Sequence, residues 1–137
     1  MNIPALDRSN YLKGLLITAK IDKQLSDKEK EIIKGISDKL GFATDFYNET
    51  IRSLLSNPYI TEEPITFSDL KIARSFLLDA IKLACSGGDI SQAEINWIIE
   101  TAKLNSIEED FIRKNINSYK ESPVLMRNTE FALYSII

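Results

Sequence analysis

Apolar residues recur along most of the chain at spacings of three and four, the period of a helix that buries one face. Seven stretches carry this apolar pattern, at residues 12–19, 32–40, 46–55, 68–84, 95–102, 107–116 and 124–137. No stretch alternates apolar and polar residues for long enough to compete as a strand. The pattern therefore predicts an all-α protein of about seven helices.

Helix-breaking residues separate these stretches. Gly41 follows the second one, as a left-handed C-cap would. Asn57-Pro58 ends the third, and Gly87-Gly88 ends the fourth. Residues 57–67 contain two prolines without a clear period and are expected to form the longest loop.

Helix starts are marked by a serine followed three residues later by a glutamate. Ser26-x-x-Glu29, Ser91-x-x-Glu94 and Ser106-x-x-Glu109 have this spacing. In such a capping box the serine oxygen accepts a backbone amide and the glutamate reaches back to the first residue. We therefore expect three capped helices, beginning after Ser26, Ser91 and Ser106.

The chain also matches itself at an offset of 65 residues, without a gap, when residues 11–55 are laid on residues 76–120. Nine of these 45 positions are identical, and most of the other apolar positions agree in character. Three helices per copy cannot close a core alone. We expect a single domain, residues 1–137, whose two copies pack about a pseudo-twofold axis, with a C-terminal helix, residues 124–137, sealing one side.

Composition limits the classes of function. With 17 Lys plus Arg against 20 Asp plus Glu, a net charge of -3 and a pI near 5.1, the chain lacks the basic balance of a nucleic-acid binder. It contains no His, which excludes Ser-His and Cys-His catalysis and any His-ligated metal site. No signal peptide pattern and no membrane-spanning apolar run is present, so we expect a cytoplasmic protein.

Two single residues have two interpretations each. Cys85 is either a reactive thiol or a small apolar residue near a helix end, and the lack of a His partner favours the second. Trp97 is either part of a binding surface or a partly buried stripe residue. Because Trp97 aligns with the apolar Ile32 in the first copy, we expect partial burial.

The loops before the second helix of each copy contain candidate metal ligands. The first loop region offers Asp22, Gln24 and Glu29, and the second offers Asp89 and Glu94. These hard oxygen ligands suit weak binding of Ca²⁺ or Mg²⁺, although neither loop has EF-hand spacing. In the alternative interpretation, the aspartates shape the turns and the glutamates complete the capping boxes.

The first of these loops lies in a recognisable pattern. Ala19, Asp22, Leu25, Ser26 and Glu29 form Ala-x-x-Asp-x-x-Leu-Ser-x-x-Glu. This pattern resembles the A-x-A-D-G-x-I-S-x-x-E signature of the tellurite-resistance TerB-like family, which also occurs in some J-domain co-chaperones. The resemblance covers roughly residues 5–120.

The resemblance implies an all-helical fold of two repeats, divalent metal binding by acidic residues, and a place in bacterial stress-response complexes. The chain departs from the signature at two positions. Lys23 stands where the family has Gly, which places a cation beside the candidate site, and Gly87 replaces the aspartate in the second copy.

Three functions therefore compete. The first is a non-enzymatic TerB-like module that binds other proteins, with weak divalent metal binding at most. The second is a scaffold whose apolar C-terminus, residues 124–137, forms a weak homodimer instead of closing the core. The third is a small enzyme using carboxylates such as Glu29 and Glu94. We favour the first, with the scaffold as its main rival. The enzyme is the least favoured, because each of these acids already has a capping role.

Overall fold

The computed structural model describes residues 2–21, 25–56, 61–86, 88–121 and 131–137, without the side chains of residues 54–56. All regular secondary structure in these residues is helical, so the all-α prediction is confirmed. The elements are the α-helices α1 (Ala5–Ile21), α2 (Asp27–Lys39), α3 (Thr44–Ser56), α4 (Leu70–Ser86), α5 (Gln92–Leu104) and α6 (Glu109–Glu121), and the 3₁₀ helix η2 (Ala132–Ser135).

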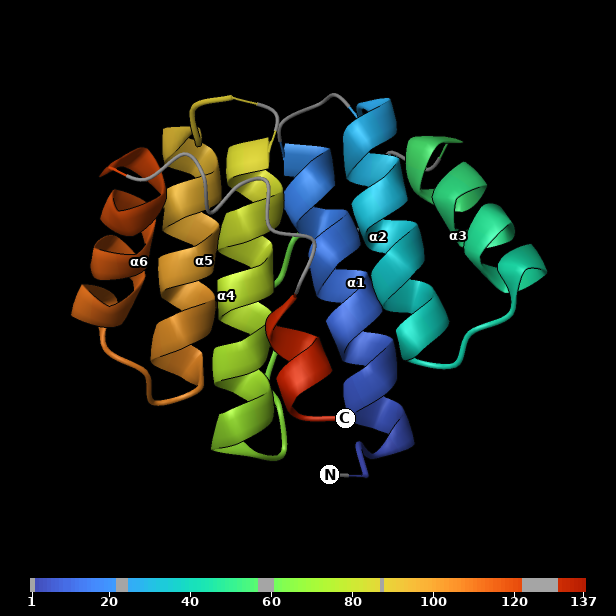
Figure 1. Cartoon of the computed structure of the whole chain (residues 1–137), viewed down its shortest axis with the longest axis horizontal. Helices are drawn as coiled ribbons and strands as arrows, with labels where there is room; N and C mark the ends of the chain where they lie inside the picture. The colour runs from blue at the N-terminus through green and yellow to red at the C-terminus, as the bar shows by residue number, and fades with distance from the viewer. Residues whose placement is uncertain (1, 22–24, 57–60, 87, 122–130) are drawn as a thin grey trace.

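The helices lie side by side across the molecule in the order α6, α5, α4, α1, α2, α3 (Figure 1). The two central helices, α1 and α4, form the most extensive helix pair. Residues 11–19 of α1 are all buried except Lys13, as expected of a helix surrounded by others. Among the described residues, no helix is long and apolar enough to cross a membrane.

The helix boundaries follow the offset of the sequence match. α1 and α4 have 17 residues each, and α2, α3, α5 and α6 have 13 each. Each helix of the second half begins and ends 65 residues after its counterpart in the first half, for example at Ala5 and Leu70.

The turns after α2 and α5 are also alike. The amide of Phe42 donates to the Ser37 carbonyl at 3.1 Å, and the amide of Ile107 donates to the Ala102 carbonyl at 2.8 Å. These are the long hydrogen bonds of Schellman motifs, whose next-to-last residue is left-handed. That residue is Gly41 in the first turn, with φ 89°, as the sequence predicts.

The corresponding residue of the second turn is Ser106, with φ 60°. The prediction that Ser106 caps the sixth helix is wrong, because α6 begins only at Glu109. The Schellman motif that ends α5 places Ser106 in the left-handed conformation, whereas an N-cap residue has extended backbone.

Two short segments cover opposite faces of the α1–α4 pair, with residues 61–67 behind it and residues 131–137 in front (Figure 1). The rear segment is fixed by α5. The Trp97 indole donates to the Glu62 carbonyl at 3.1 Å, and the Asn105 side chain donates to the Ile65 carbonyl at 2.7 Å. Asn105 also accepts the Phe67 amide at 2.8 Å.

The front segment differs from the seventh helix that the sequence predicts. Residues 124–130 of that helix lie outside the described residues, and Ala132–Ser135 form a short 3₁₀ helix instead of an α-helix. Leu133 and Ile136 are buried against the core. The apolar content of this end therefore reflects burial of a short covering segment and not helical periodicity.

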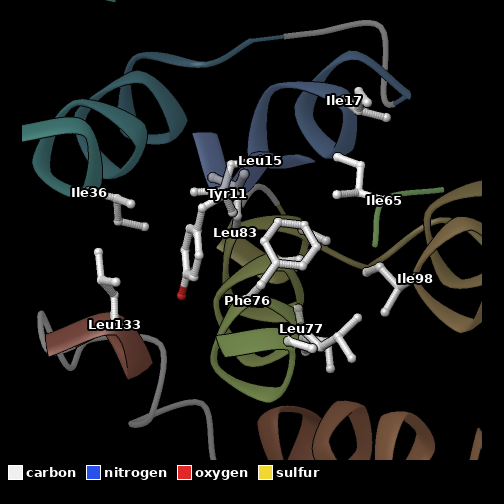
Figure 2. Packing of buried hydrophobic residues seen from close by; sticks show 14 of the residues in the cluster. Tyr11, Leu15, Ile17, Ile36, Ile65, Phe76, Leu77, Leu83, Ile98 and Leu133 are labelled. Carbon is white, nitrogen blue, oxygen red and sulfur yellow. The ribbon is translucent and has the colours of Figure 1, made fainter. Parts of the chain in front are cut away.

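Aromatic rings fill the centre of the core. The Phe76 ring lies 5.4 Å from that of Tyr11, 5.1 Å from that of Phe67 and 6.1 Å from that of Trp97. Gly14 leaves the room for it, because a Cβ atom at Gly14 would lie 2.4 Å from the tip of the Phe76 ring. Figure 2 shows Tyr11 and Phe76 side by side, with the Tyr11 hydroxyl directed towards η2.

Candidate functional site

The five candidate metal ligands are only partly placed by the structure. Asp22 and Gln24 lie outside the described residues. Glu29 and Glu94 are buried in the first turns of α2 and α5, and Asp89 is exposed. In the part of the chain that the structure describes, no three acidic or Cys side chains gather as a metal site would require.

The described glutamates complete the predicted capping boxes of α2 and α5. The Glu29 amide donates to Ser26 Oγ at 3.1 Å, and Glu29 Oε1 accepts the Ser26 amide at 3.2 Å. In α5 the Glu94 amide donates to Ser91 Oγ at 3.1 Å, and Glu94 Oε1 accepts the Ser91 amide at 3.0 Å. Both glutamates thus have the structural role that the alternative interpretation gives them.

Cys85 and Trp97 also have structural surroundings. Cys85 is buried, and this burial is the main cause that raises the pKa of its thiol to about 11, which disfavours the reactive thiolate. Trp97 is buried, and its indole N–H is satisfied by the Glu62 carbonyl. The sequence predicts partial burial of Trp97, and the structure buries this side chain more completely, with 5% exposed.

A buried carboxyl that the sequence analysis did not single out ties the C-terminal segment to the core. Asp79 of α4 is 1% exposed. Its Oδ1 accepts the Ala132 amide at 2.7 Å, and its Oδ2 accepts the Leu133 amide at 3.1 Å. The Tyr11 hydroxyl, from α1, lies 2.5 Å from the same Oδ2 and 2.9 Å from Ser75 Oγ.

Burial of Asp79 is the largest influence on its ionisation. Desolvation raises the pKa of this carboxyl to about 6, against the opposing effects of its hydrogen bonds and of the nearby Lys82 charge. The sequence carries a signal for this site, because Asp79 is the lone acid within the buried stretch from Ile72 to Ala84. Its partners come from distant segments and have no local signal.

A second buried carboxyl fixes the start of α4. Asp7 of α1 is 2% exposed and accepts both the backbone amide of Ser68, at 3.0 Å, and the Ser68 hydroxyl. This contact joins α1 to the end of the rear segment. Asp7 and Asp79 therefore both serve as acceptors that hold the covering segments in place.

An open apolar groove lies between α1 and α3. This α1–α3 groove has a volume of about 280 Å³. Its walls are Leu12, Leu16, Ile17, Phe42 and Phe46, and its rim consists of Ser9, Lys13, Thr50 and Ser53. The rings of Phe42 and Phe46 stack at 5.1 Å, and Phe46 is 49% exposed.

The second half differs at the corresponding positions. Phe111 matches Phe46 at the 65-residue offset but is half-buried, and Ile107 matches Phe42 and is buried. Lys13 at the groove rim is matched by the partly buried Leu78 and makes no ion pair with any described residue. The first half therefore exposes the apolar Phe46 beside the Lys13 ammonium, whereas the equivalent positions of the second half are more buried and include no cation.

No family model, no curated protein sequence and no solved structure matches this chain in comparisons with known proteins.

Proposed function

We propose that the chain is a TerB-like helical module that binds a partner protein through the α1–α3 groove and has no enzymatic activity. The observation that carries this proposal is the groove itself, a preformed apolar hollow beside the half-exposed Phe46. The resemblance of the sequence to the TerB-like family supports a role in bacterial stress-response or tellurite-response complexes.

We further propose that the two halves are structural repeats related by a pseudo-twofold axis. Such an axis makes contacts reciprocal. If two residues of different halves are in contact, the two residues equivalent to them in the opposite halves are also in contact. Tyr11 contacts Asp79, and their equivalents at the 65-residue offset, Phe76 and Gly14, are also in contact. The equal helix boundaries and the matching Schellman turns support the same arrangement.

The chemistry of the groove indicates the kind of partner. Grooves between two helices commonly receive the apolar face of an amphipathic helix. Here the walls offer aliphatic and aromatic side chains, and Lys13 adds a single positive charge at the rim. We propose that the partner presents an amphipathic helix with aliphatic residues on one face and a carboxylate placed to meet Lys13.

The alternatives have weaker support. A homodimer formed through the C-terminus would use apolar residues there, yet Leu133 and Ile136 face the protein's own core. A carboxylate enzyme needs acids of unlike pKa at an open cavity. The acid of raised pKa, Asp79, is buried beneath the C-terminal segment, and Glu29 and Glu94 hold helix starts.

Metal binding remains part of the proposal only as a weak property of the first loop. A cation that used Glu29 would compete with the Ser26 amide and hydroxyl, which both donate to Oε1. Glu94 Oε1 is likewise engaged by the Ser91 amide. We therefore propose at most weak binding of Ca²⁺ or Mg²⁺ at the first loop.

Two matched substitutions test the groove. Phe46 is 49% exposed and Leu104, in α5, is 52% exposed, so replacing either by Ser should leave the melting temperature nearly unchanged. Tagged full-length wild type, Phe46→Ser and Leu104→Ser are used to capture proteins from cells that naturally express the chain. We expect the partner captured by the wild type to be kept by Leu104→Ser and reduced about tenfold or more by Phe46→Ser. Equal capture by both variants would contradict the proposal.

A further inference from the structure

The C-terminal segment, residues 131–137, is held to the rest of the molecule by the Asp79 carboxyl, a small apolar contact and two lysines over its aromatic rings. Both oxygens of Asp79 accept backbone amides of the segment, from Ala132 and Leu133. The segment's own Leu133 and Ile136 are buried against the core, and Figure 2 shows Leu133 facing Ile36 and Tyr11. The segment therefore stays in place only while a small number of contacts hold.

The hydrogen bonds around Asp79 can be satisfied in two protonation states. With an ionised carboxylate, the two amides and the Tyr11 hydroxyl all donate to it. With a neutral carboxyl, the Asp79 Oδ2–H can donate a hydrogen bond to the Tyr11 hydroxyl, which in turn can donate to Ser75 Oγ. Both Asp79 oxygens can still accept the two backbone amides. Only the ionised state places a net negative charge in a buried site, which is costly.

Several charged or titratable groups face Asp79 from the elements around it. Tyr11 lies on α1, Lys82 on α4 itself, Tyr119 on α6 and Tyr134 on η2. Asp79 raises the pKa of each of these three tyrosines, in addition to the larger effect of burial. The α2 residues Asp38 and Lys39 lie near Tyr134, and Lys39 Nζ is 5.3 Å from the centre of that ring.

We propose that Asp79 and residues 131–137 form a proton-controlled clasp, closed by the neutral carboxyl and loosened when the carboxyl ionises. The Lys82 ammonium, 4.7 Å from the centre of the Phe131 ring, packs on the same segment and partly balances the carboxylate. In this proposal the clasp is closed in most molecules, whether the Asp79 carboxyl is neutral or ionised. Loss of the proton therefore changes only the small fraction of molecules in which the clasp is open.

The direction of the pH effect follows from linkage. Burial raises the pKa of Asp79 to about 6 in the closed state, whereas opening would hydrate the carboxyl and return its pKa towards about 3.9. The closed state therefore binds the proton more tightly, and the stabilisation that the proton gives to the closed state is fully present below about pH 3. Raising the pH from about 3 to about 7 favours opening, by about 100-fold in the open population, and the effect then levels off.

Opening would uncover the apolar strip on which the segment lies. That strip includes Ile36 of α2 and Tyr11 of α1, which are both fully buried in the closed state. The clasp is separate from the α1–α3 groove, because none of the residues that line the groove belongs to the segment. It would therefore give the molecule a second apolar surface whose exposure depends on pH.

Hydrogen exchange of the full-length protein, followed by nuclear magnetic resonance, tests the clasp. The protection factors of the Ala132 and Leu133 amides, corrected for the intrinsic pH dependence of exchange, should fall about 100-fold between about pH 3 and pH 7. Those of core amides such as Ile98 should be higher at every pH, because core amides exchange only through global unfolding. In Asp79→Asn, which is neutral at every pH, the difference between low and neutral pH should disappear.

The proposal is overturned if the wild-type factors do not change or rise with pH, if the Ala132 and Leu133 amides are protected as strongly as core amides, or if Asp79→Asn keeps the dependence. A direct titration of the Asp79 carboxyl by its carbon-13 shift covers the case in which Asp79→Asn does not fold. Its midpoint should lie near 6, and a midpoint near the ordinary value of about 3.9 would remove the basis of the clasp. Tyr11→Phe, which removes a hydrogen bond that lowers this pKa, should move the midpoint upwards.

Discussion

At the scale of single residues, Gly14 shows how closely the two halves approach each other. An added Cβ atom would lie 2.4 and 2.5 Å from two carbons of the Phe76 ring. That ring is fully buried among the rings of Tyr11, Phe67 and Trp97, so it cannot move aside cheaply. We expect Gly14→Ala to lower the free energy of unfolding by about 1–3 kcal/mol, despite the higher helix propensity of Ala.

Chemical denaturation of the wild type and variant measures this change. Gly35→Ala is the matched control, since it is another helical glycine, and its Cβ would have only the Tyr134 hydroxyl nearby, at 3.7 Å. A Gly14→Ala protein as stable as the wild type would mean that Phe76 does not pack on α1 as described.

Single residues were predictable from the sequence where their signal is local. Ser26 and Ser91 cap their helices as predicted, because the partner of each lies three residues away. Asp79 was missed as a site, because Tyr11 lies 68 residues from it in the chain and Leu133 lies 54 residues from it. A lone acid in a buried apolar stretch indicates a buried partner, but only the fold identifies it.

At the scale of elements, the turn after α5 contains a residue that is poorly suited to its backbone. Ser106 has φ 60°, whereas Gly41 occupies the equivalent position after α2. The left-handed conformation costs a residue with a side chain about 1 kcal/mol or more relative to Gly. We expect Ser106→Gly to raise the free energy of unfolding by about 1 kcal/mol, and Gly41→Ser to lower it by a similar amount.

Thermal and denaturant unfolding of the two variants checks this pair of expectations. The result that would contradict it is a loss of stability in Ser106→Gly, which would assign the Ser106 side chain a capping role after all.

The loop before α2 has its own prediction, which concerns metal. Only a few acids are available there, and Lys23 adds a positive charge, so we expect calcium to bind with a dissociation constant of about 10⁻⁴ to 10⁻³ M. At about 10 mM calcium and a constant near 1 mM, the stabilisation would be about 1.4 kcal/mol. The melting temperature should then rise only at millimolar calcium, and less so in Asp22→Asn.

Sodium chloride at matched ionic strength is the control for that titration. Micromolar affinity lost in Asp22→Asn would show a stronger site than we propose. Flat calorimetric heats at several millimolar calcium would show that the loop serves as a turn alone.

Helix positions were predictable from the sequence because their period and their breaking residues are local features. The third helix ends at Ser56, just before the predicted stop at Asn57-Pro58. The predicted C-terminal α-helix, residues 124–137, is wrong for residues 131–137, the part that the structure describes. Apolar content indicates burial there but does not specify an α-helix. Ala132–Ser135 instead form a 3₁₀ helix, whose first amides donate to the distant Asp79 carboxyl.

At the scale of the whole molecule, the two halves match in their helix boundaries but differ in what they expose. The equivalent helices are α1 and α4, α2 and α5, and α3 and α6. In the order α6, α5, α4, α1, α2, α3 of Figure 1, equivalent helices lie at equal positions from the two ends of the row. The sequence repeat predicted this equivalence of helix boundaries. It could not predict the α1–α3 groove, because the packing of Phe46 and Phe111 differs although the two residues are identical.

The central claim, that the α1–α3 groove receives a partner protein, is tested most directly by a photo-crosslinking residue placed in the groove. The full-length protein would carry benzoylphenylalanine at position 46, or at the equally exposed position 104 as the control, in cells that naturally express it. We predict a light-dependent adduct of one discrete mass from position 46 and none from position 104. Equal adducts from both positions, or none from position 46, would contradict the account.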